Sequence, residues 1–218
     1  MSDQLLASVI VVAIMLLVGF PVHEFAHALA AYRLGDSTAR LMGRLTLNPV
    51  VHFDPLGGIL LAITLLSGTG FAFGWAKPTP VNPNNLEGGR SGEAIVAAAG
   101  PISNLVLAIA AALPLRYLLA NPELYAQVPD IVIGVLQLFI LINLILMIFN
   151  LFPIPPLDGS KVLFALLPPR VSWQWRPMLE QYGFIILLIV FFVPPGNSIG
   201  GRILSPVLRG AFDLLVGR

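Results

Sequence analysis

Long apolar runs set the main constraint on how this chain folds. They cover residues 5–32, 92–119 and 131–152. Each is long enough to cross a bilayer as a helix, which takes about 20 mostly apolar residues. Only 11% of the residues are charged, against about 25% in ordinary soluble domains. The sequence therefore predicts an all-α polytopic membrane protein with a core of three transmembrane helices.

The segment between the first two runs is expected to be irregular. Residues 57–73 are apolar, but they are short for a crossing and rich in glycine at both ends, which favours a re-entrant segment. Short alternating stretches such as Arg44-Leu45-Thr46-Leu47 predict strands within residues 44–55, and residues 71–81 are a second candidate. The fold class therefore includes a re-entrant or short-strand segment after the first helix.

The length suits one membrane-embedded domain, residues 1–218, without a sizeable soluble domain. Its core is expected at about residues 5–166, followed by C-terminal membrane segments at about 181–218. Residues 184–193 are a short apolar run, and residues 199–218 are amphipathic. One or two C-terminal membrane helices are therefore expected.

The chain contains no cysteine. This excludes disulfides, iron–sulfur clusters and thiolate metal sites. Any bound metal must therefore be held by His, Asp or Glu.

His23-Glu24-Phe25-Ala26-His27, near the end of the first helix, has the HExxH arrangement. Residues four apart share a helix face, so both imidazoles can bind one metal ion. Glu24 can then accept a proton from a water on that metal, and a third ligand would leave one tetrahedral position open for this water. Ionisable groups are costly within an apolar run. The pattern predicts a zinc enzyme; the alternative is a hydrogen-bonded packing cluster.

A third protein ligand is needed. The candidates are Asp158, Asp54, His52, Glu93 and Glu87. Asp158 is favoured because it follows an apolar helix and a rigid proline run, and such a loop can hold a carboxylate where it lines a cavity. The alternative is a simple Asp-Gly turn at the helix exit.

Charge distribution predicts the orientation. If residues 57–73 are re-entrant, Asp158 returns to the side of the histidines. Through the third helix, the opposite side then holds only Arg116 as a basic residue, and basic residues favour the cytoplasmic side. We therefore expect a multi-pass protein of the cell membrane, with the N-terminus outside and the active site toward the cytoplasm.

These motifs together resemble the site-2 protease family of intramembrane metalloproteases (the M50 class). Residues 23–27 are similar to its metal helix, and residues 150–159 (NLFPIPPLDG) to its second signature. Residues 99–104 (AGPISN) are similar to a third pattern, and residues 48–55 to the compact bacterial branch without PDZ or CBS domains. The resemblance covers most of the chain, up to about residue 166.

The resemblance implies a Zn2+ metalloendopeptidase that cuts peptide bonds within or near transmembrane segments (regulated intramembrane proteolysis). His23, His27 and Asp158 would be the metal ligands and Glu24 the catalytic base. Asn150 would stabilise the oxyanion, and Asn104 is a second candidate, holding substrate backbone. The alternative for either asparagine is an inter-helix hydrogen bond. The expected partners are a transmembrane protein substrate and the lipid bilayer, with no nucleic acid.

Other functions remain as alternatives. A membrane metal-binding or transport protein would place ionisable residues along a path, yet the helices after the HExxH group hold almost none. A catalytically silent scaffold would lack an expected group, and none is missing. A membrane-anchored peptidase with its site outside the bilayer would have more polar residues around the motif. His52 is expected to be structural, with a proton shuttle or a substrate contact as the alternatives. The sequence does not indicate the oligomeric state.

Overall fold

Helices make up the regular structure of the protein, as the apolar runs predict. The computed structural model describes residues 3–66, 74–194 and 198–217. These residues form helices and no β-strand. Within them, three stretches are long and apolar enough to cross a membrane: Leu6–Arg33, Arg90–Leu119 and Asp130–Asn150. The all-α class and the three-helix core are therefore confirmed.

The first spanning stretch consists of α1 (Asp3–Ile14), the π-helical turn η1 (Met15–Gly19) and α2 (Phe20–Arg33). Pro21 lies in the first turn of α2. It has no N–H with which to continue the hydrogen bonds of the preceding helix. The π turn ends at Gly19, two residues before Pro21, where the regular hydrogen-bonding pattern is interrupted.

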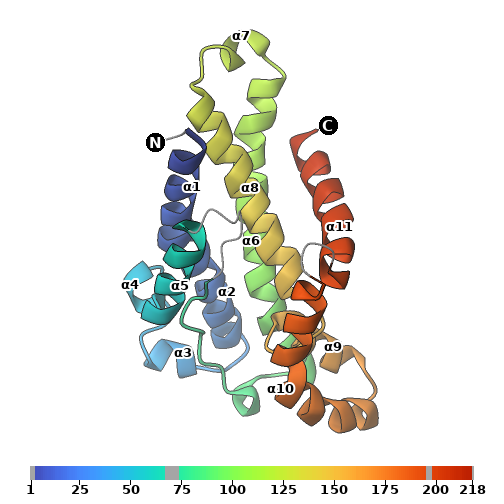
Figure 1. Cartoon of the computed structure of the whole chain (residues 1–218). Coiled ribbons are helices and arrows are strands. Elements are labelled where there is room, and N and C mark those ends of the chain that lie inside the picture. The colour runs from blue at the N-terminus through green and yellow to red at the C-terminus, as the bar shows by residue number, and fades with distance from the viewer. Residues whose placement is uncertain (1–2, 67–73, 195–197, 218) are drawn as a thin grey trace.

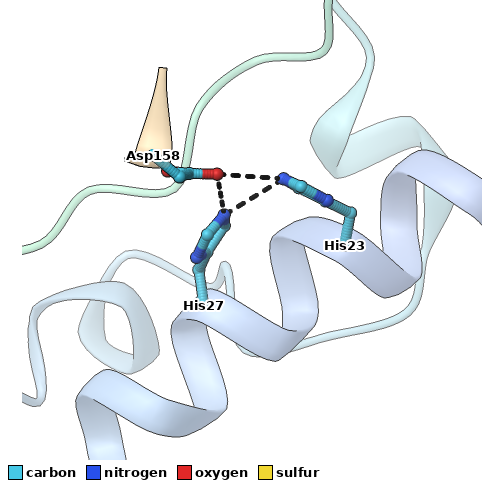
Figure 2. A group of neighbouring side chains, drawn as sticks. All are labelled: His23, His27 and Asp158. Atoms are coloured by element: carbon cyan, nitrogen blue, oxygen red, sulfur yellow. Dashed lines mark hydrogen bonds and ion pairs between the residues drawn. The ribbon is translucent and has the colours of Figure 1, made fainter. Parts of the chain in front are cut away.

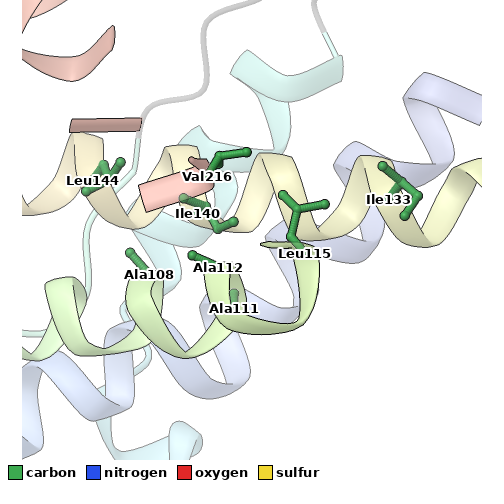
Figure 3. Close-up of a cluster of buried hydrophobic side chains, with 8 residues drawn as sticks. All are labelled: Ala108, Ala111, Ala112, Leu115, Ile133, Ile140, Leu144 and Val216. Atoms are coloured by element: carbon green, nitrogen blue, oxygen red, sulfur yellow. The ribbon is translucent and has the colours of Figure 1, made fainter. Parts of the chain in front are cut away.

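The helices α6 (Arg90–Leu119) and α8 (Asp130–Asn150) form the centre of the bundle and are linked through α7 (Pro122–Tyr125). Alanines on α6 pack against larger aliphatic side chains on α8, and small residues let two membrane helices approach closely. Figure 3 shows the buried residues of this cluster, which are Ala108, Ala111, Ala112, Leu115, Ile133, Ile140, Leu144 and Val216.

The described part of the segment between α2 and α6 carries four short helices: α3 (Thr38–Leu41), α4 (Pro49–His52), α5 (Pro55–Leu66) and η2 (Pro83–Asn85). The predicted strands are wrong for the described part of this segment. Asn48 caps α4 by accepting a hydrogen bond from the Val50 N–H, and Pro49 follows in the first helical turn. This combination starts a helix where the alternation predicted a strand.

The chain returns to the start of α5 by residue 74. A Cβ atom added to Gly74 would lie 2.6 Å from the Gly57 carbonyl oxygen. Likewise, a Cβ atom added to Gly57 would overlap the Trp75 carbonyl oxygen. The 12 residues of α5 extend about 18 Å at 1.5 Å per residue, short of the roughly 30 Å hydrocarbon core. Residues 67–73, part of the predicted re-entrant segment, lie outside the described residues.

The C-terminal part contains α9 (Asp158–Leu166), α10 (Pro169–Phe192) and α11 (Ile199–Val216). Figure 1 shows α10 and α11 following one another along the bundle, with both chain termini at the end that also carries α7. Contacts fix this course. Phe191 of α10 packs on Phe149 and Phe152, and near the C-terminus Arg116 donates a hydrogen bond to the Leu214 carbonyl.

Candidate metal centre

The helix α2 brings the two histidines of the HExxH motif onto one face. Their Nε2 atoms lie 3.1 Å apart, and both side chains are buried. Figure 2 shows the rings directed toward a common point beside the helix. The four-residue spacing therefore produces the predicted arrangement.

Asp158, the first residue of α9, completes the group. Its Oδ2 lies 3.5 Å from His23 Nε2 and 3.2 Å from His27 Nε2. One donor atom from each of the three residues lies within 4.8 Å of the others, and they are the one such group of His, Asp and Glu among the described residues. Two imidazoles and a carboxylate with a free coordination position are a donor set that suits catalytic zinc.

The other candidates for the third ligand are engaged elsewhere or exposed. Glu93 is paired with Arg176, at 2.8 Å between Oε1 and Nη2. Asp54 accepts the N–H groups of the first turn of α5. The His52 ring is bonded through Nε2 to the Thr46 carbonyl at 2.8 Å, and Glu87 is exposed.

Gly100 on α6 leaves the space in which the ligand atoms converge. A Cβ atom at this position would lie 2.6 Å from His23 Nε2, and still closer to His27 Nε2. Real Cβ atoms do not approach other atoms so closely, so any side chain here would displace the imidazoles. The cradle in front of the donor atoms therefore depends on this glycine.

Hydrogen bonds behind the histidines fix which ring nitrogen faces the centre. His27 Nδ1 lies 2.7 Å from the Val96 carbonyl, which can only accept, so Nδ1 carries the proton. His23 Nδ1 lies 2.6 Å from Asn104 Oδ1. Both Nε2 atoms are thus left with their lone pairs toward the centre, the form that binds a metal.

Asn104 lies behind His23 and is fully buried. Its Nδ2 donates to Asn143 Oδ1 at 2.9 Å, and Asn143 Nδ2 donates to the Phe139 carbonyl at 2.9 Å. Asn104, which was expected to hold substrate backbone, therefore forms a hydrogen bond between two helices, the alternative role considered for this residue. Asn143 extends this network to α8 and was not singled out from the sequence.

Glu24 lies next to the group and is held by a segment distant in sequence. Its Oε2 accepts a hydrogen bond from the Thr79 N–H at 2.7 Å. Among the described residues, no hydrogen bond reaches Oε1. Asn150 lies half-buried at the end of α8, and its side-chain amide has no hydrogen-bond partner in the described part of the chain.

The charge of Asp158 is set by its neighbours. Burial alone would raise the pKa of this carboxyl, but the imidazoles of His23 and His27 outweigh burial and hold the pKa below its ordinary value. Lys161 adds a cation 3.9 Å from Oδ1. The group is therefore a carboxylate at neutral pH.

The sequence is similar to known proteins over most of its length. The profile of peptidase family M50 matches residues 118–191. The "Putative zinc metalloprotease YwhC" of Bacillus subtilis (strain 168) is 39% identical over 204 residues, which cover 93% of this chain and 88% of that protein. The chain belongs to peptidase family M50. The predicted family and enzyme class, a metalloprotease, are thereby confirmed.

Two further relatives of this M50 member are named "Putative zinc metalloprotease Rip2". The protein of Mycolicibacterium smegmatis is 33% identical, over 80% of this chain and 64% of its own length. That of Mycobacterium tuberculosis (strain H37Rv) is 28% identical, over 84% of this chain and 66% of its own length. No solved structure matches the chain.

The M50 profile match begins at residue 118. It therefore includes Asp158 but not the two histidines, which lie nearer the N-terminus. The fold joins these two parts of the sequence in one group of donor atoms. Gly100, Asn143 and Thr79 support this group, and their contacts were not predicted. For Asn143, the available signal was a polar residue within an apolar helix, which is costly unless it is bonded.

Proposed function

We propose that this chain hydrolyses peptide bonds within or near transmembrane segments of membrane proteins, with Zn2+ held by His23, His27 and Asp158. The observation that carries the proposal is the convergence of their donor atoms within 4.8 Å. The predicted cofactor agrees with the relatives, whose names are those of zinc metalloproteases. The donor set and the cradle at Gly100 fit this ion.

Bound zinc supplies Lewis-acid chemistry, which acidifies water and polarises a carbonyl. Glu24 takes the proton from the attacking water through Oε1 and later delivers it to the leaving amine. The Asn150 amide donates to the developing oxyanion, a role that its unbonded side chain supports. Asn104 and Asn143 hold the His23 ring in the tautomer that leaves Nε2 free for the metal.

The substrate must present an extended backbone, because the amides of a helix are bonded internally. The coil of residues 74–82 lies beside Glu24 and is a candidate to bind this extended backbone. The return of the chain from α5 to residue 74 supports a re-entrant segment that leads into this coil.

We place the catalytic end of the molecule at the cytoplasmic face of the cell membrane. Basic residues at that end are Arg33, Arg40, Arg44, Lys77, Arg90, Lys161, Arg170 and Arg176. At the end carrying α7, the loop between α6 and α8 follows Arg116 and contains no other basic residue. The helix α11, which runs toward this end, adds Arg202 and Arg209, so eight of the 12 basic residues lie at the catalytic end. An excess of Lys and Arg favours the cytoplasmic side. In this arrangement α10 and α11 together make one further crossing.

Zinc content and cleavage test this function in detergent-purified protein. We expect about one zinc per wild-type chain, a clear loss in Asp158→Ala, and retention in Glu87→Ala, which removes an exposed candidate ligand. Glu24→Gln should retain zinc but lose cleavage of a doubly labelled transmembrane peptide, with products mapped by mass spectrometry. Unchanged zinc in Asp158→Ala would overturn the ligand set. Retained cleavage in Glu24→Gln would overturn the base.

A further inference from the structure

The coil of residues 74–82, named here the strap, crosses α2 beside Glu24. The Thr79 N–H donates to Glu24 Oε2 at 2.7 Å, and Thr79 Oγ1 donates to the Glu24 carbonyl at 3.0 Å. The two residues are 55 positions apart. The strap therefore contacts both the side chain and the main chain of the glutamate in the HExxH motif.

The sequence around Thr79 makes its N–H distinctive. The strap reads Pro78-Thr79-Pro80 at this point. Proline has no N–H, so Thr79 supplies the main-chain donor of this tripeptide. That donor is used on a carboxylate, and a hydrogen bond to an ionised acceptor is stronger than one between neutral groups.

The strap is fixed on both sides of Thr79. Before it, the Lys77 N–H donates to the His52 carbonyl at 2.8 Å. After it, the Asn82 N–H donates to Asp36 Oδ2 at 2.7 Å, and Asp36 is fully buried. The Thr79 N–H is therefore held in place by contacts that do not involve Glu24.

We propose that Thr79 is a positioning residue whose backbone N–H fixes the Glu24 carboxylate for proton transfer. The bond occupies Oε2 and leaves Oε1 without a hydrogen bond among the described residues, so that Oε1 can take the proton. The inference rests on the proposed role of Glu24 as the base. Within the described ranges, the threonine hydroxyl bonds only to the Glu24 main-chain carbonyl, so the effect belongs to the N–H and not to the side chain.

Two substitutions separate the N–H from the side chain. Thr79→Val keeps the N–H and removes the hydroxyl, whereas Thr79→Pro removes the N–H. Because Thr79 precedes Pro80, its backbone is already restricted to extended and polyproline conformations, which proline can also adopt. The α-hydroxy acid analogue of threonine, introduced at position 79 by nonsense suppression, replaces only the N–H by an ester oxygen. It serves as the second N–H deletion if the proline variant does not fold.

The readouts are kcat, KM and zinc content, with the doubly labelled transmembrane peptide as substrate. For the proline and ester forms we expect kcat to fall about 10- to 100-fold, the cost of misplacing a catalytic group. KM and zinc content should stay at wild-type values, because Glu24 does not bind the metal. Thr79→Val should keep a kcat close to that of the wild type.

Several results would overturn the inference. Wild-type kcat without the N–H would show that Glu24 does not need it. A rise in KM alone would show that the N–H binds substrate, and an equal loss in Thr79→Val or a loss of zinc in the ester form would show a structural role. A failure of the proposed function is distinguishable, since it appears as cleavage by Glu24→Gln with Thr79 intact.

Discussion

At the residue scale, Gly100 constrains the candidate metal centre directly, because an added Cβ would overlap the positions of the ligand nitrogens. We predict that Gly100→Ala loses most of its zinc, although alanine is the better helix former. Zinc per chain, measured after purification in detergent, checks this. Gly210→Ala is the matched control, since a Cβ there meets nothing within 4 Å. Full zinc content in Gly100→Ala would mean that the helices move apart to accept the methyl group.

Asn143 is linked by hydrogen bonds through Asn104 to His23, one of the proposed zinc ligands. Removing it leaves the Asn104 amide without its acceptor and frees the imidazole to rotate. Loss of such an outer hydrogen bond weakens metal affinity by about 10- to 100-fold, and we predict this for Asn143→Ala in competition titrations with a zinc chelator. Asn121→Ala is the control, because in the described part of the chain the Asn121 amide donates only to the Tyr117 carbonyl in the last turn of α6, and it should bind zinc as the wild type does. Equal affinities in the two variants would exclude the relay.

The residues that sequence could predict at the metal centre are those with a local spacing rule. His23 and His27 are four apart, and helix geometry alone puts them on one face. Gly100 and Asn143 obey no local rule. Their roles arise from the contact of α6 with α2 and α8, which brings together residues far apart in the chain. A pattern within one segment does not contain that information.

At the element scale, the strap depends on Asp36, just after α2. Burial alone would raise the pKa of this carboxyl, but hydrogen bonds from Thr38 and from the strap outweigh burial and lower the pKa. A lowered folded-state pKa stabilises the protein above the unfolded value of about 4, and this contribution is lost as the pH falls through the folded value. The strap is therefore anchored best at neutral pH.

We predict that Asp36→Asn lowers the free energy of unfolding by about 1–3 kcal/mol at pH 7, since buried donors lose a charged acceptor. The difference from wild type should shrink as the pH falls below about 4 and through the lowered folded-state pKa, where the carboxylate of the folded wild type becomes protonated. Denaturation of both proteins in detergent, at pH 7 and again below about pH 4, measures this difference. Glu123→Gln, an exposed change, is the control. A difference that persists unchanged at low pH would show that Asp36 contributes through shape and not charge.

Prediction at this scale succeeded for the long helices and failed for the strands. The runs at 92–119 and 131–152 match α6 and α8 to within two residues at each end, because burial in a bilayer demands an internally bonded backbone. The alternation of polar and apolar residues at 44–47 does not by itself require a strand. A strand needs a partner, and in this part of the fold the described neighbours are helices and coil.

On the scale of the whole molecule, the proposed topology has one consequence that does not depend on activity. The N- and C-termini share the end of the bundle that carries α7, whereas α3 and α9 lie toward the other end (Figure 1), and α9 begins with Asp158. If α10 and α11 together cross the membrane, both termini face outside. Eight of the 12 basic residues then lie at the cytoplasmic end, as the excess of Lys and Arg on that side requires.

Single cysteines can test this cleanly, because the chain has none of its own. In intact cells, a membrane-impermeant maleimide should label Glu123→Cys in the loop at α7 and a cysteine appended after Arg218. It should label Met42→Cys, whose side chain is 63% exposed beyond α3, only after permeabilisation. Labelling of Met42→Cys in intact cells would reverse the orientation. If the appended cysteine reacted only after permeabilisation while Glu123→Cys reacted before, α10 and α11 would not cross, and the C-terminal helices would lie on the cytoplasmic face.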